Sequence, residues 1–185
     1  MSTFYTTRLC ILSGGPGMGK TTLLRQLAAL GHTCFPESGR AIIRQQLATG
    51  GTALPWQDRE AFAGLMFRQG LADYNLARTQ RGLLFFDRGL PDVTGYLEFS
   101  DLPVPPEIEH ATHLYRYHPL VAMTPPWKEI YVNDAERKQS FEEATATYDV
   151  MRSVYLRYGY HPFDLPLVGV RQRAAYLLAR MKALR

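Results

Sequence analysis

The interpretation of this sequence starts from one stretch, Gly14-Gly15-Pro16-Gly17-Met18-Gly19-Lys20-Thr21. It matches the pattern G-x-x-x-x-G-K-[ST] in full, and it lies between an apolar run over 8–13 and a helical pattern that begins at 20. Glycines let the main chain wrap closely around an anion and turn its N–H groups inward, while the following helix directs the positive end of its dipole there. The stretch therefore predicts a loop that binds the phosphates of a nucleoside triphosphate.

The polar residues of this loop suit a triphosphate with a metal ion. Lys20 supplies a mobile positive charge for the β- and γ-phosphates. Thr21 places a hydroxyl where Mg²⁺ needs an oxygen ligand, and Thr22 follows it on the same helix end. We therefore expect ATP or another nucleoside triphosphate, with Mg²⁺, as the cofactors.

Short apolar runs alternate with helical patterns along the rest of the chain. Such alternation predicts a parallel sheet that is covered by helices on both faces, as a three-layer α/β/α domain. The expected strands are 8–13, 33–36, 83–86, 118–123 and 162–165. The expected helices are 20–30, a segment from 38 to about 49, 57–80, a short one to 99, one from 106, 135–158 and 170–184.

Composition narrows the class of protein. With 185 residues, 46% of them hydrophobic and 21% charged, the chain has the size and make-up of one globular domain over 1–185. Two cysteines exclude a disulfide scaffold, and no apolar run reaches the roughly 20 residues that a membrane span requires. The first residues lack the pattern of a signal peptide. We expect a cytoplasmic protein with no membrane partner.

Two carboxylates are placed for chemistry beside the phosphates. Asp87 ends the third apolar run and Glu37 follows the second, so both belong at the edge of the sheet where ligands of parallel sheets bind. Asp87 is a candidate ligand of Mg²⁺, and either carboxylate is a candidate base for the proton of an acceptor hydroxyl. The alternatives are an ion pair at a strand end for Asp87 and a helix-dipole contact for Glu37.

Four segments together carry a family resemblance: the phosphate loop, ESGR at 37–40, FFDRG at 85–89 and RKQSFEEA at 137–144. In this order they resemble the small P-loop proteins described as AAA domains or predicted ATPases, a group close to the nucleoside, nucleotide and nicotinamide-riboside kinases. The resemblance covers nearly the whole chain and implies a five-stranded sheet in the order 2-3-1-4-5. The chain departs from AAA+ motors, because it has no Asp-Glu pair at the third strand and no helical lid domain.

The resemblance also implies roles for particular residues. The pair Asp87-Arg88 resembles that of thymidylate-kinase-like and deoxynucleoside-kinase-like enzymes, in which the acid serves metal or base and the arginine serves phosphate. Glu37 corresponds to the glutamate that accepts the acceptor's proton in deoxynucleoside kinases. A lid-like segment over about 133–145 would bring Arg137, and after it Lys138, to the transferred phosphoryl group. Adjacent cations at a helix start are poorly placed electrostatically, which supports a role for them outside helix stability.

Further residues are candidates for binding the acceptor. Arg40 and Arg44 share one helix face and suit an anionic group, as does Arg88. Gln69, in the middle of the longest helical pattern, has an amide that suits a base or amide edge. Trp56, Trp127 and Tyr131 are candidates for stacking on a ring, although aromatic residues near turns more often serve packing.

The net charge of +4 comes almost entirely from arginine. We interpret the basic end of the chain as the solvated face of a terminal helix and do not expect nucleic acid as a partner. This end comprises Arg171, Arg173, Arg180, Lys182 and Arg185.

The combined pattern predicts an ATP- and Mg²⁺-dependent phosphotransferase that moves the γ-phosphoryl group to a small nucleoside- or nucleotide-like acceptor. The alternative is an ATPase or GTPase-like switch that hydrolyses the triphosphate without such an acceptor. No motif identifies the acceptor or an oligomeric state.

Overall fold

The computed structural model describes residues 6–131 and 140–182. Five strands form one sheet in the order β2-β3-β1-β4-β5, and every neighbouring pair is parallel. The strands are β1 (Leu9–Gly14), β2 (Thr33–Phe35), β3 (Leu84–Asp87), β4 (Leu120–Thr124) and β5 (His161–Asp164). The fold class and strand order expected from the sequence are confirmed.

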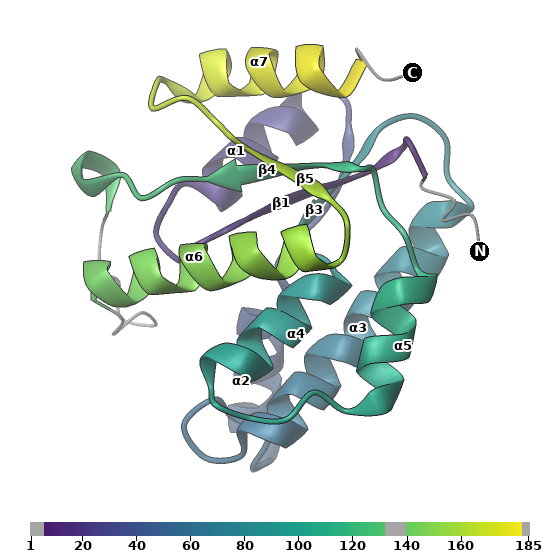
Figure 1. The fold of residues 1–185 in the computed structure, drawn as a ribbon, viewed down its shortest axis with the longest axis vertical. Helices are drawn as coiled ribbons and strands as arrows, with labels where there is room; N and C mark the ends of the chain where they lie inside the picture. Colours follow the sequence, from purple (N-terminus) through teal and green to yellow (C-terminus); the bar gives the residue numbers. More distant parts are fainter. Residues whose placement is uncertain (1–5, 132–139, 183–185) are drawn as a thin grey trace.

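Helices cover both faces of this sheet (Figure 1). The helices are α1 (Lys20–Ala29), α2 (Ser38–Thr49), α3 (Arg59–Arg78), α4 (Leu90–Phe99), α5 (Pro106–Leu114), α6 (Phe141–Arg157) and α7 (Val170–Lys182), with a 3₁₀ turn at Lys128–Ile130. Helices α1 and α7 lie on one face and α6 lies on the other, with α4 packed between α6 and the pair α3 and α5. Within 6–131 and 140–182 no helix is both long and apolar enough to cross a bilayer.

The central strand β1 explains why its sequence is continuously apolar. Leu9 and Ile11 point into the core beneath α6, whereas Cys10 and Leu12 point into the core beneath α1 and α7. All six residues of β1 are buried, because both faces of the sheet are covered. The strand ends at Gly14, which places the phosphate loop at the carboxyl edge of the sheet.

The two cysteines lie on strands that do not touch. Cys10 on β1 and Cys34 on β2 are both registered to Phe85, which stands between them on β3. Neither cysteine forms a disulfide; Cys10 is buried and Cys34 is half-buried. Burial raises the pKa of the Cys34 thiol to about 11, so this thiol stays protonated at neutral pH.

Helix α6 begins later than the sequence suggested. Its first residue is Phe141, and Ser140 caps it by accepting a hydrogen bond from the Glu143 main-chain N–H at 3.2 Å. The first turn of α6 carries Glu142 and Glu143, two acidic residues that the helix dipole favours at this end. Arg137 and Lys138 lie outside the described residues.

We expect the core beneath α1 to be sensitive to truncation. Leu27 is fully buried there, whereas Leu30, at the end of the same helix, is 53% exposed. Leu27→Ala should lower the free energy of unfolding in urea by about 2–5 kcal/mol, because the lost methyl groups leave a cavity. Leu30→Ala is the matched control and should stay within about 0.5 kcal/mol of the original chain. Equal effects of the two changes would contradict the assigned packing.

Candidate functional site

The phosphate loop has the backbone that its glycines permit. Gly14, Gly17 and Gly19 have φ values of 125°, 77° and 79°, which residues other than glycine rarely adopt. Gly19 is the N-cap of α1, so the loop turns directly into the helix. Lys20 is buried, and its ammonium donates hydrogen bonds to the carbonyls of Gly14 at 3.4 Å and Gly15 at 2.7 Å. The predicted lysine therefore curls back over the loop that should hold phosphate.

The loop also lies against helix α6. A Cβ at Gly15 would collide with the main-chain oxygen of Ala144, so no larger residue fits at this position. Residues 141–145, the end of the predicted lid-like segment, are thus the first turns of α6 packed on the phosphate loop.

A cleft of about 460 Å³ opens beside the loop. Its wall includes Thr21 and Thr22 at the exposed start of α1, together with Trp127 from the segment after β4. The turn over Val168–Val170, which enters α7, forms another part of the wall. A cleft between the loop, the segment after β4 and the turn after β5 has the position and size of a nucleotide site.

Arg173 corrects the expectation that the whole arginine-rich end is solvated. It is 3% exposed, its guanidinium donates to the Met18 carbonyl at 3.4 and 3.5 Å, and it lies 5.7 Å from the centre of the Trp127 ring. Burial lowers the pKa of Arg173. Its Nε has no hydrogen-bond partner among the described residues. The sequence held a signal for this burial: Arg173 falls in the apolar stripe with Ala174, Leu177 and Met181.

Asp87 lies at the end of β3, on the floor of the site. It is 5% exposed, and its Oδ1 has no hydrogen-bond partner within the described part of the chain. A buried carboxylate oxygen that lacks a donor is costly unless a cation binds it. The Asp87 carboxylate and the Thr21 hydroxyl are hard oxygen donors of the kind that Mg²⁺ accepts, so the chemistry of these side chains fits the metal.

Burial raises the pKa of the Asp87 carboxyl to about 6. The nearby Lys20 ammonium opposes this rise in pKa, whereas the carboxylates of Glu37 and Asp92 reinforce it. A bound divalent cation would lower the same pKa by favouring the ionised form.

Arg88 links Glu37, which precedes α2, to Asp92 on α4. Its Nε donates to Glu37 Oε1 at 3.0 Å, and its Nη1 donates to Asp92 Oδ1 at 3.1 Å. Burial alone would lower the pKa of Arg88, but the carboxylates of Glu37, Asp92 and Asp87 raise it above its ordinary value, so the guanidinium stays charged. Arg88 has a φ of 76°, an uncommon conformation for a residue with a side chain, which these contacts hold in place.

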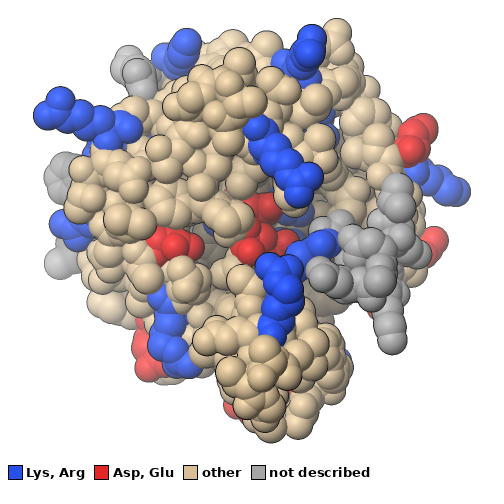
Figure 2. All heavy atoms as spheres, turned by 180° about the vertical axis from the view of Figure 1, so that it is seen from behind, with Lys and Arg blue, Asp and Glu red and all other residues tan. Residues whose placement is uncertain are grey.

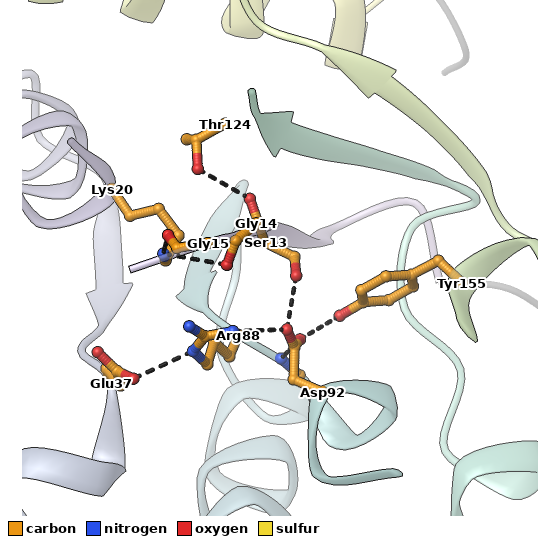
Figure 3. A network of polar contacts seen from close by, with 10 residues as sticks. Ser13, Gly14, Gly15, Lys20, Glu37, Arg88, Asp92, Thr124 and Tyr155 are labelled. Atoms are coloured by element: carbon orange, nitrogen blue, oxygen red, sulfur yellow. Dashed lines mark hydrogen bonds and ion pairs between the residues drawn. The ribbon is translucent and has the colours of Figure 1, made fainter. Parts of the chain in front are cut away.

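Asp92 is a residue that the sequence analysis missed (Figure 3). This buried carboxylate accepts hydrogen bonds from the Ser13 hydroxyl at 2.5 Å, the Gly89 N–H at 2.8 Å, Arg88, and the Tyr155 hydroxyl on α6. Its position four residues after Arg88 and in the first turn of α4 was the available signal.

A second and larger cavity of about 820 Å³ adjoins the nucleotide cleft. Glu37 and Arg40 line both cavities, and Arg44 lines the larger one. Gln69 does not line it: this exposed amide donates instead to Asp73 Oδ1 at 2.9 Å, and Asp73 is part of the wall. Figure 2 shows acidic side chains gathered in a hollow of this surface, with basic side chains beside them.

Comparison with solved structures identifies the class of fold. Deoxyadenosine kinase from M. mycoides matches with a TM-score of 0.63 and 12% identity, over 96% of this chain and all of that one. Shikimate kinase from Acinetobacter baumannii matches with a TM-score of 0.58 and 15% identity, over 98% and 97%. The NadR protein in complex with NR matches with a TM-score of 0.64 and 19% identity, over 96% of this chain and 50% of that one. At such identities the likeness establishes a P-loop kinase fold.

The sequence itself places the chain in a family. A family model described as "AAA domain" matches residues 9–173, so the chain belongs to this family of P-loop proteins. No curated protein matches the chain in sequence.

Because the pKa of Asp87 is raised, ionisation of this carboxyl should destabilise the folded chain when no metal ion is bound. Between pH 3.8 and about 6 the folded chain keeps a proton that the unfolded chain has released, so the free energy of unfolding falls as the pH rises. Asp87→Asn removes this ionisation. At pH 7.5, without Mg²⁺ or nucleotide, the variant should be more stable by about 3 kcal/mol in urea, and the difference should vanish near pH 4.

Asp149→Asn, at an exposed position on α6, is the matched control and should change the free energy of unfolding at pH 7.5 by no more than about 0.5 kcal/mol. An Asp87→Asn chain that is no more stable than the original at pH 7.5 would refute this electrostatic assignment.

Proposed function

We propose that this chain is an ATP- and Mg²⁺-dependent kinase that moves the γ-phosphoryl group to a hydroxyl or phosphate of a small acceptor. One observation carries the proposal: the cleft beside the phosphate loop shares the lining residues Glu37 and Arg40 with a second cavity that is large enough for another molecule. A hydrolytic enzyme needs room only for water at this point, whereas a transferase needs a site for the acceptor. Nucleoside- and nucleotide-like compounds are the first acceptors to test.

The loop and the residues around it would hold the triphosphate in the smaller cleft. The main-chain N–H groups of 14–19, apart from Pro16, which has none, and the Lys20 ammonium would bind phosphate oxygens, for which Lys20 leaves the carbonyls of Gly14 and Gly15. Mg²⁺, held by Thr21 and Asp87, would neutralise charge on the phosphates. Trp127 and Arg173 offer an aromatic face and a guanidinium to the base of the nucleotide.

Glu37 would serve as the base at the junction of the two cavities. The acceptor oxygen bonds to the γ-phosphorus while the bond from phosphorus to the β,γ-bridging oxygen breaks. The acceptor proton passes to the Glu37 carboxylate, and ADP leaves. Arg88, which is fixed by Glu37 and Asp92, places a positive charge beside the transferred group. Arg137 and Lys138 remain proposed lid cations.

The first test is a phosphoryl-transfer screen. Labelled ATP and Mg²⁺ are incubated with a panel of nucleosides, nucleotides, nicotinamide riboside and other alcohols. Transfer to an acceptor should disappear in Lys20→Ala, because the γ-phosphate loses its main positive partner, and circular dichroism should confirm that the variant is folded. Turnover in Lys20→Ala near that of the original chain would overturn the mechanism. Release of free phosphate at a rate that no acceptor changes would favour the alternative, a hydrolytic ATPase.

A second experiment separates the two carboxylates. Glu37→Gln keeps a hydrogen-bond acceptor for Arg88 but removes the base, so kcat should fall by about 10²–10⁴-fold with an unchanged Mg²⁺ requirement. Asp87→Asn should instead raise the Mg²⁺ concentration needed for half-maximal rate. The opposite pattern, in which Glu37→Gln shifts the Mg²⁺ requirement and Asp87→Asn does not, would exchange the two roles.

A further inference from the structure

The wall of the larger cavity is mainly apolar. Aromatic and aliphatic side chains come from β2, α3 and α4, and the rings of Phe35 and Phe86 stack at 4.5 Å between centroids. The apolar lining includes Phe35, Phe62, Met66, Val93, Tyr96 and Phe99. Its volume of about 820 Å³ lies toward the upper end of the roughly 300–1,000 Å³ that small-molecule sites occupy. The wall therefore suits a sizeable apolar body more than a compact polar one.

The charged groups of the cavity do not favour an acceptor that carries a phosphate of its own. Five carboxylate residues line it against three arginines, so the lining has a formal excess of two negative charges. Arg88, one of these three arginines, already donates to Glu37 and Asp92. A second phosphate would meet repulsion from these carboxylates. A neutral hydroxyl meets no such repulsion and finds hydrogen-bond acceptors in Glu37 and Asp87.

The cavity is elongated along α2. The positions that line it on this helix run from Glu37 at the N-cap to Leu47, ten residues on, which corresponds to about 15 Å of helix. At the far end, Leu47 and Trp56 line the same cavity, although they are 60% and 64% exposed. Two large apolar side chains at a cavity rim form a surface that a ligand can cover.

From this arrangement we propose that the acceptor is a phosphate-free alcohol with an elongated apolar body. Its hydroxyl lies at the Glu37 and Asp87 end, and its body follows the α2 and α3 wall toward Leu47 and Trp56. The assignment of the hydroxyl rests on the proposed kinase function. Binding of the apolar body depends only on the shape and polarity of the cavity. Binding of the body and transfer to the hydroxyl can therefore be tested separately.

Trp56 provides a direct readout of binding. The chain has two tryptophans, so Trp127→Phe leaves Trp56 at the rim as the sole one. The probes are a series of phenylalkanols from 2-phenylethanol to 6-phenylhexanol, added without nucleotide while tryptophan emission is recorded. Covering the exposed indole should shift its emission to shorter wavelength. Each added methylene should lower the Kd by about fourfold, because it buries a further apolar group.

Matched variants on α3 locate the binding site. Met66 lines the cavity, whereas Leu76 on the same helix does not and is 56% exposed. Met66→Gln, in the Trp127→Phe background, should raise the Kd of 6-phenylhexanol by about tenfold or more, because the amide places a polar group against the apolar body. Leu76→Gln should leave the Kd unchanged.

Three outcomes would overturn the proposal: a Kd that does not depend on chain length, equal effects of the two α3 variants, or AMP that competes with 6-phenylhexanol at the Trp56 site. Failure of the kinase function gives a different result. The alcohols would then bind with the predicted length dependence, but no label from ATP would reach them in the presence of Mg²⁺ in the original chain.

Discussion

The site depends on one buried carboxylate. Asp92 binds the hydroxyl of Ser13 on β1, the main chain of Gly89 at the start of α4, the Arg88 guanidinium and the Tyr155 hydroxyl on α6. Three segments that are distant in sequence, namely β1, the start of α4 and α6, are thereby fixed to one another beside the phosphate loop (Figure 3). A buried charge is tolerated only where several donors surround it, and here they also hold Arg88 toward Glu37. The positions of the Arg88 guanidinium and of the proposed base Glu37 therefore depend on the hydrogen bonds that surround Asp92.

Much of the fold could be predicted from the sequence, because the patterns that specify it are local. The phosphate-loop pattern predicts a strand before it and a helix after it. Continuous apolar runs such as Leu9–Leu12 indicate strands that are buried on both faces. The resemblance supplied the strand order, which the structure confirms. The start of α6 was missed because the capping pair Ser140 and Glu143 went unrecognised among the surrounding charges.

The parts of the site that were missed depend on tertiary contacts. Arg173 looks like a surface cation in a basic helix, and only the packing of α7 against α1 brings its guanidinium to Met18 and Trp127. Asp92 resembles an ordinary first-turn acid until Ser13 and Tyr155 converge on it. Gln69 was chosen for its place on α3, but Asp73, one turn further on, lines the cavity. The spacing of residues in the sequence determines which of them share a face of a helix. Which other element that face contacts depends on the whole fold.

The division of labour between the two cavities has a consequence for how such a protein can diversify. The smaller cleft is built mainly from the phosphate loop, the segment after β4 and the turn before α7, whereas α2, α3 and α4 supply half of the residues that line the larger one. Among the residues that the structure describes, only Glu37 and Arg40 line both cavities. Substitutions on the inner faces of α3 and α4 can therefore redraw the second cavity while the phosphate loop keeps its geometry. The geometry of the phosphate loop can thus stay constant while the shape and polarity of the larger cavity vary. The start of α2, which lines both cavities, connects the two sites.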